Sequence, residues 1–100
     1  MHSISLTGTV IAASLLLAGC GPSDYAPATG SNAADIFASA CANCHGDGGE
    51  GKMGMVFKLK GTELSDAEIA AKIATGSSLM PAFPNISEEE RLAIAGYLKN

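Results

Sequence analysis

The amino-acid sequence predicts a single small all-α domain that is built around a bound group. The chain has 100 residues, enough for one domain at most. Three stretches place apolar residues at helical spacing, and no stretch of useful length alternates as a strand does. The foldable part, residues 32–100, has short helices and long loops, and a domain of this size rarely buries enough apolar surface to be stable alone. We therefore expect something else to fill its centre.

Residues 1–19 are expected to be a secretory signal that is removed. Residues 4–18 are mostly apolar, but the run is too short and too interrupted by Thr, Gly and Ser to span a membrane as a helix. The sequence LAGC at 17–20 resembles the lipobox of bacterial lipoprotein signals, which implies cleavage before Cys20 and lipid on that residue. Residues 1–3 depart from the pattern because they contain no Lys or Arg. The alternative is a buried N-terminal helix.

Residues 20–31 are expected to be the lipidated cysteine and a flexible linker. The segment GPSDYAPATGS at 21–31 is rich in Pro, Gly and Ser and has almost nothing to bury. Its typical end-to-end distance is roughly 18 Å, so the domain would stay near a bacterial membrane, on the periplasmic or extracellular side. All charged residues follow residue 19, and their net charge of −4 argues against nucleic acid as a partner.

The first helix is expected from Asn32 to about Asn43. Asn32 suits the N-cap, and Asp35 lies in the first turn, where the helix dipole favours a carboxylate. The residues that share one face by helical spacing are Ile36, Phe37 and Ala40.

The second helix is expected over residues 65–76. Ser65 and Glu68 form a capping-box pattern, and Gly76 suits the C-terminal end. Its apolar residues, one turn apart, are Ile69 and Ile73.

The third helix is expected over residues 87–100. Ser87 and Glu90 form a second capping-box pattern. Gly96 lowers helix propensity by ~1 kcal/mol relative to Ala, so we expect another helix to cross closely there. The apolar face comprises Ile94, Tyr97 and Leu98, with Leu92 beside it.

The segment Cys41-Ala42-Asn43-Cys44-His45 has the C-x-x-C-H pattern by which haem c is attached. The spacing lets two thiols reach the two vinyl groups on one edge of a porphyrin, while His45 presents an imidazole nitrogen to the iron. We therefore expect one covalent haem c, held by Cys41 and Cys44.

Other uses of the two cysteines agree less well with the sequence. A thioredoxin-like pair needs a βαβ context. A structural zinc site needs four ligands, so a carboxylate would have to complete the motif. A disulfide across two intervening residues closes too small a loop to stabilise much. The adjacent GDGGEG at 46–51 matches G-x-G-x-x-G, but no strand precedes it, so we expect a flexible turn and no dinucleotide site.

The sixth iron ligand decides between electron transfer and ligand chemistry. Met80 lies in SLMPAFP at 78–84, 35 residues after His45 and beyond the second helix, so the chain can return on the opposite side of a porphyrin. The two prolines of this segment exclude a helix and hold the thioether in place. Met53 and Met55 are the alternatives, but the glycines before them provide no means of holding them.

Four pieces of the chain support a family resemblance: Phe37, CANCHG at 41–46, LMPAF at 79–83 and EEERLAIAGYL at 88–98. With these pieces residues 32–100 resemble a small bacterial class I cytochrome c of the c6/c551/c553 type. The resemblance implies the class I cytochrome c fold, in which the first and last helices cross and Phe37 meets Tyr97 or Leu98. It also implies axial ligands at His45 and Met80. Family members commonly have a proline near the carbonyl that accepts the His Nδ1 proton; here we expect a carbonyl of residues 55–59 instead.

The expected function is a membrane-tethered, monomeric carrier of single electrons between redox partner proteins, and not an enzyme. A thioether ligand favours ferrous iron and raises the reduction potential. Two alternatives stay open: a haem protein with a labile sixth ligand, peroxidase-like or gas-sensing, and a fixed haem c subunit of a larger oxidase or reductase. The residues expected in the pocket or core are Ile69, Ile73, Leu79, Phe83, Leu92 and Ile94. Those expected in a small apolar docking patch are Ala42, Met55, Val56 and Ala82.

Overall fold

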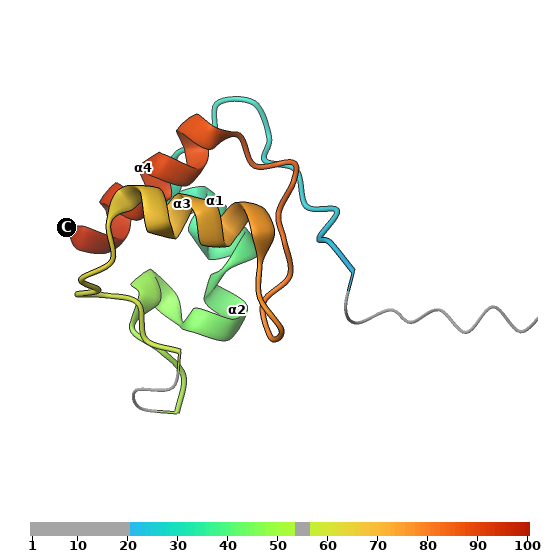
Figure 1. Ribbon diagram of the computed structural model, residues 1–100. Coiled ribbons are helices and arrows are strands. Elements are labelled where there is room, and N and C mark those ends of the chain that lie inside the picture. Colours follow the sequence, from blue (N-terminus) through green and yellow to red (C-terminus); the bar gives the residue numbers. More distant parts are fainter. Residues whose placement is uncertain (1–20, 54–56) are drawn as a thin grey trace, which may run out of the picture.

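The described part of the chain is all-α, as the sequence predicts. The computed structural model describes residues 21–53 and 57–100, so the expected signal and Cys20 lie outside it. These residues form α1 (Ala33–Ala40), α2 (Ala42–His45), the 3-10 turn η1 (Asp47–Gly49), α3 (Asp66–Thr75) and α4 (Glu88–Lys99), with no strand among them (Figure 1). None of the helices in these two ranges has the length and apolar character needed to cross a bilayer.

The first predicted helix is interrupted at Cys41. Asn32 caps it as expected, its Oδ1 accepting a hydrogen bond from the Asp35 N–H at 2.8 Å. The expectation of one helix through Asn43 is wrong, because α1 ends at Ala40 and α2 begins after Cys41, whose backbone has φ −118° and ψ −35°. This distorted turn lets two N–H groups, of Cys44 and His45, donate to the Cys41 carbonyl, at 3.2 and 2.9 Å.

Both predicted capping boxes form. In α3 the Glu68 N–H donates to Ser65 Oγ at 3.1 Å, and the Ser65 N–H donates to the Glu68 carboxylate at 2.9 Å. In α4 Ser87 and Glu90 make the same reciprocal pair at the same distances. Such a cap contributes about 1 kcal/mol to helix stability, which is why these two helices begin where local sequence predicts.

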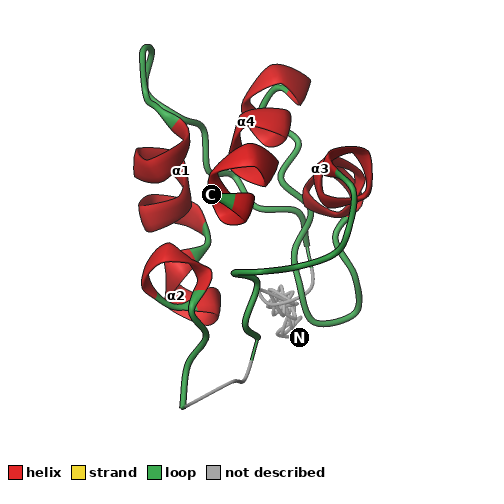
Figure 2. Cartoon of the chain, turned by 90° about the vertical axis from the view of Figure 1, so that its left-hand side faces the viewer, coloured by secondary structure: helices red, strands yellow, loops and turns green. Residues whose placement is uncertain are grey.

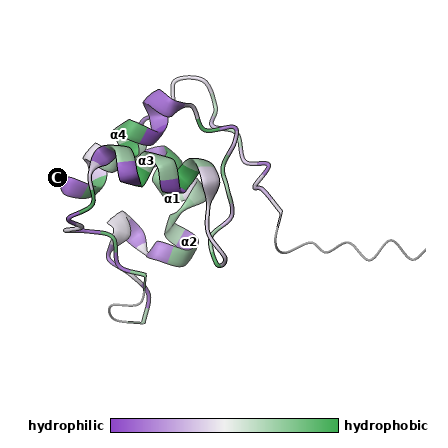
Figure 3. Cartoon of the chain, viewed as in Figure 1, coloured by the Kyte–Doolittle hydropathy of each residue, from purple (hydrophilic) through white to green (hydrophobic). Residues whose placement is uncertain are grey.

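The core lies where α4 packs against α1 and α3. Hydrophobic residues gather on these three helices, whereas the first turn of α4 is hydrophilic (Figure 3). The rings of Phe37 and Tyr97 lie 5.6 Å apart between centroids, which confirms the expected contact between the first and last helices. The core residues that are at most 1% exposed are Ile36, Phe37, Ile86, Ile94 and Ala95.

Gly96 does not lie at a close helix crossing, so that expectation is wrong. No atom of the described residues would come within 4 Å of a Cβ placed on Gly96, apart from its own helix and chain neighbours. The buried face of α4 is formed by Ile94, Ala95 and Leu98. Ala95 therefore provides the small side chain in the interface, and nothing in the structure explains the glycine beside it.

Two of the residues expected in the pocket or core do not lie in the core of the described residues. Leu79 is 82% exposed and Leu92 is 39% exposed. Leu92 is two positions from Ile94, about 200° around the helix, so it turns outward when Ile94 faces the core. Leu79 lies next to Met80 in the loop between α3 and α4. In this loop Met80 packs against the core cluster and Leu79 does not. The remaining expected core residues are buried: Ile69, Ile73, Phe83 and Ile94.

The segment before α1 contains no helix or strand between residues 21 and 32, but it touches the domain. Tyr25 is partly buried against the core cluster, so the expectation of almost nothing to bury is wrong at this residue. The Ser23 N–H donates to the Ala82 carbonyl at 2.8 Å, and Asn85 Nδ2 donates to the Asp24 carbonyl at 3.3 Å. These contacts join the segment to the loop between α3 and α4.

Candidate functional site

The interruption after α1 gives the two motif cysteines different surroundings. Cys41 is buried and Cys44 is exposed, and the structure leaves both as free cysteines with no disulfide between them. Burial raises the pKa of the Cys41 thiol to about 11, and the neighbouring Cys44 adds to the rise. A neutral sulfur is therefore favoured at position 41. A thioether is also neutral, so this position suits a covalent link to an apolar ring edge.

His45 has the geometry of a metal-binding imidazole. Its Nδ1 lies 2.6 Å from the carbonyl oxygen of Phe57. Because a carbonyl only accepts, Nδ1 carries the proton, which leaves the Nε2 lone pair free for a metal. The expectation of an acceptor among residues 55–59 is thus confirmed, with Phe57 as the residue. A hydrogen bond from the other ring nitrogen fixes the tautomer and raises the basicity of the ligand.

Phe57 adopts a strained backbone to make this contact. Its φ is +59°, which is rare for a bulky side chain and costs about 1–3 kcal/mol. Its ring lies 6.1 Å from the imidazole of His45, edge to face. Strain of this kind persists only where the surrounding structure imposes it. Here the strained backbone conformation places the Phe57 carbonyl where it accepts the His45 Nδ1 proton.

The turn after α2 holds this acceptor in place. The N–H groups of Leu59 and Lys60 both donate to the Gly49 carbonyl, at 2.8 and 2.9 Å. Gly49 is buried with φ +80°, and a Cβ there would lie 2.8 Å from a methyl group of Leu98. The expected flexible turn at 46–51 is thus packed between α4 and the segment that carries Phe57. The sequence missed this role because it depends on a contact with the distant α4.

Met80 lies in a loop that is fixed at several points. It is half-buried and packs against the core cluster. The Ser77 N–H donates to the Met80 carbonyl at 2.8 Å, and the Phe83 N–H donates to the Ile73 carbonyl at 2.9 Å. Gly76 ends α3 with φ +68°, and a Cβ on it would lie 2.5 Å from the Met80 carbonyl oxygen. The sequence predicts Gly76 only as the end of a helix. It does not predict that the backbone of the Met80 loop packs closely against this glycine.

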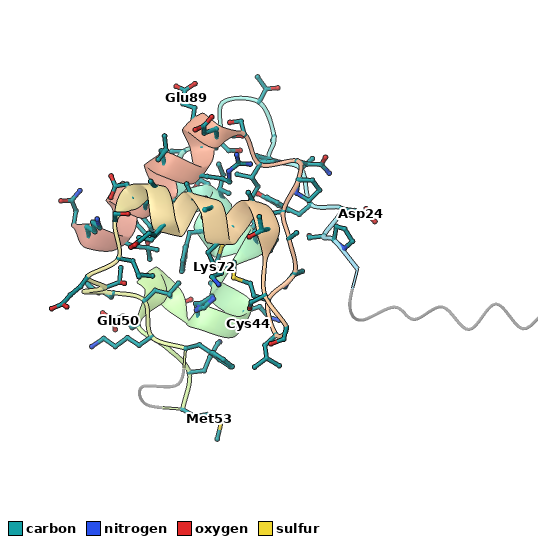
Figure 4. The ribbon with its side chains drawn as sticks, in the orientation of Figure 1. Asp24, Cys44, Glu50, Met53, Lys72 and Glu89 are labelled. Atoms are coloured by element: carbon teal, nitrogen blue, oxygen red, sulfur yellow. The ribbon has the colours of Figure 1, made fainter. Side chains whose placement is uncertain are left out.

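Helix α2 and the loop that carries Met80 lie on different sides of the domain, as seen in the view of Figure 2. Figure 2 shows α2 on one side and the loop between α3 and α4 on the other. Met53 is 96% exposed and lies at the far end of the molecule, directed away from the helices (Figure 4). Met55 lies outside the described residues. Among the described residues, Met80 is therefore a methionine that packs against the core, whereas Met53 does not.

The expected docking patch changes in part. Ala42 is buried, at 9% exposed, so its place in an exposed patch is wrong. Ala82 is half-buried, while Met55 and Val56 lie outside the described residues.

The described residues offer no second kind of metal site. Within 21–53 and 57–100, no three His, Cys, Asp or Glu side chains gather closely enough to hold a metal ion. The carboxylate that a zinc site at the motif would require is thus not found beside the motif in these ranges.

The chain was compared with known protein families and with curated proteins. A protein-family model described as cytochrome c oxidase, cbb3-type, subunit III matches residues 28–98. The matched range contains α1, α2 and α3, α4 up to Leu98, both motif cysteines, His45 and Met80. No curated protein matches the chain.

Proposed function

Because the chain belongs to the cytochrome c family whose model is described as cytochrome c oxidase, cbb3-type, subunit III, and therefore binds haem c covalently, we propose that it carries single electrons with His45 and Met80 as axial ligands. Within this family we propose a small monohaem protein resembling the c6/c551/c553 type. Cys41 and Cys44 would form the two thioether links. The observation that supports this proposal best is the 2.6 Å contact of His45 Nδ1 with the Phe57 carbonyl, since it frees Nε2 for iron.

The residues of the chain have separate roles in this proposal. Bound haem iron supplies a one-electron couple. Phe57 holds His45 in one tautomer, so the imidazole keeps its orientation whichever charge the site has. Met80 contributes a soft sulfur, which favours the reduced state. The hydrogen bonds of its loop hold that sulfur in place, so little polypeptide has to move when an electron arrives or leaves.

The proposed location follows from the sequence. Residues 1–19 would be removed as a signal, and Cys20 would carry lipid that anchors the domain on the periplasmic or extracellular side of a bacterial membrane. The proposed partners are redox proteins at that surface, and the carrier itself is proposed to be a monomer. Mass spectrometry of the mature chain reports the acyl groups and the covalent haem together.

A fixed haem c subunit of a larger complex is the second candidate. The description of the matching family names a subunit of an oxidase, which favours this candidate. The electron chemistry is the same, and the difference is how long the partner stays bound. Gentle detergent extraction followed by size separation distinguishes them: a mobile carrier elutes alone, and a fixed subunit elutes with oxidase activity.

Replacement of Met80 tests the proposed ligation. The holoprotein with Met80→Ala is expected to lose the weak far-red sulfur-to-iron band of the ferric state. Its reduction potential is expected to fall on the order of 0.1 V, a fraction of the ~0.8 V range that axial ligands set. Met53→Ala is the matched control, because Met53 is 96% exposed and its removal should change neither reading.

Two results would contradict the proposal. An unchanged spectrum in Met80→Ala would mean that another group completes the iron coordination. Rapid binding of carbon monoxide to the unmodified ferrous protein would instead indicate a labile sixth position, as in a peroxidase-like or gas-sensing protein.

A further inference from the structure

A three-residue strap, Ser23–Tyr25, lies against the loop that carries Met80. In Figure 1 the chain preceding α1 crosses the loop between α3 and α4, and Figure 4 places Asp24 beside that crossing. The Ser23 N–H donates to the Ala82 carbonyl at 2.8 Å. Asn85 Nδ2 donates to the Asp24 carbonyl at 3.3 Å, joining residues 61 positions apart.

The strap has its own fixed shape and its own attachment to the core. The Tyr25 N–H donates to Ser23 Oγ at 3.2 Å, which closes a local turn. The Tyr25 side chain is partly buried against the hydrophobic cluster. The strap is thus held by the domain at one end and contacts the loop at the other.

The contacted carbonyl is close to the proposed ligand. Ala82 is two residues after Met80, and its carbonyl accepts from the strap. Ser77 lies in the first part of the loop, before Met80, and its N–H donates to the Met80 carbonyl at 2.8 Å. One bond from within the loop and one from the strap therefore hold the backbone at Met80 and two residues after it.

We propose that Ser23–Tyr25 is a positioning element for Met80, and that it slows the release of the thioether from iron by holding the outer limb of the loop. The inference rests on the proposed ligation of iron by Met80. A ligand leaves iron when its loop moves away, and each loop hydrogen bond that must break first lowers the rate of that motion. From the net contribution of one hydrogen bond, its loss should accelerate release roughly 2- to 12-fold.

The test compares two substitutions of one residue in the full-length holoprotein. Ser23→Pro removes the N–H that donates to Ala82, whereas Ser23→Ala keeps that N–H and removes only the hydroxyl. Imidazole is mixed with the ferric protein, and the loss of the far-red band gives the rate at which the probe replaces Met80. At saturating imidazole this rate equals the rate of thioether release. The expected result is a roughly 2- to 12-fold faster rate for Ser23→Pro than for Ser23→Ala, because both variants lose the Oγ that accepts from Tyr25 and only Ser23→Pro also loses the N–H that donates to Ala82.

A second variant tests the proposal without altering the strap. Asn85→Ala removes the side-chain donor to the Asp24 carbonyl and is expected to accelerate release in the same direction. A purely structural role would lower the unfolding midpoint and leave the replacement rate in native protein unchanged. Wild-type rates in both Ser23→Pro and Asn85→Ala would overturn the strap and leave the electron-carrier proposal standing. If the unmodified protein lacks the far-red band, the proposed Met80 ligation fails, and the strap inference fails with it.

Discussion

Gly76→Ala should move the Met80 loop, because the end of α3 leaves no room for a side chain. A Cβ at this position would lie 2.5 Å from the Met80 carbonyl oxygen, 2.6 Å from the Ala82 nitrogen and 2.7 Å from the Pro81 carbonyl carbon. All three are backbone atoms, so the loop must shift as a unit by about 0.9 Å to bring the shortest contact to an ordinary distance. The backbone of Gly76, at φ +68° and ψ −166°, is also in a region essentially restricted to glycine, at a cost of about 1–3 kcal/mol for alanine.

Gly61→Ala is the matched control for this substitution. Gly61 also has a positive φ, +82°, but no atom of the described residues would lie within 4 Å of its Cβ, neighbours in the chain aside. The control therefore introduces backbone strain without a clash against the loop.

The assay is guanidinium unfolding of the ferric holoproteins, with the far-red band recorded before denaturant is added. Gly76→Ala is expected to lose about 1–3 kcal/mol more unfolding free energy than Gly61→Ala, from overpacking, and to weaken the band. If Gly76→Ala keeps the full band and is no less stable than Gly61→Ala, the proposed restraint of Met80 by the end of α3 is refuted.

A further prediction concerns the core. Phe37→Ala is expected to reduce the unfolding free energy of the holoprotein by about 3–5 kcal/mol, because the side chain is 1% exposed, whereas Met53→Ala, at a 96% exposed site, should change it by less than about 0.5 kcal/mol. Equal losses measured by denaturant titration would contradict the core assignment.

Features set by neighbouring residues could be predicted from the sequence. The two capping boxes need only residues three apart, so Ser65 and Ser87 mark the starts of α3 and α4 correctly. The acceptor for His45 could also be placed within residues 55–59, because the family resemblance implies a backbone carbonyl that accepts the His Nδ1 proton in the loop after the motif. The Phe37–Tyr97 contact was predicted because the family resemblance supplied the long-range arrangement that the local sequence lacks.

Features set by distant contacts could not be predicted. The break at Cys41 and the exposure of Leu79 depend on which side of each segment meets the core. The prediction for Gly96 was wrong for the same reason. A glycine in a helix suggests that another helix crosses closely there, but the small residue on the buried face of α4 is Ala95. The strap contact joins Asp24 to Asn85 across 61 positions, and no pattern within 21–31 reveals it.

The central claim is that the Met80 sulfur is bound to iron opposite His45. Nuclear magnetic resonance of ferrous holoprotein, labelled with ¹³C at the methionine methyl groups, tests this claim most directly. A methyl group held over the face of a porphyrin is shifted strongly upfield by the ring current. The account predicts one such methyl signal, present in Met53→Ala and absent in Met80→Ala. Methionine methyl signals that all lie at ordinary positions in the unmodified protein would contradict it.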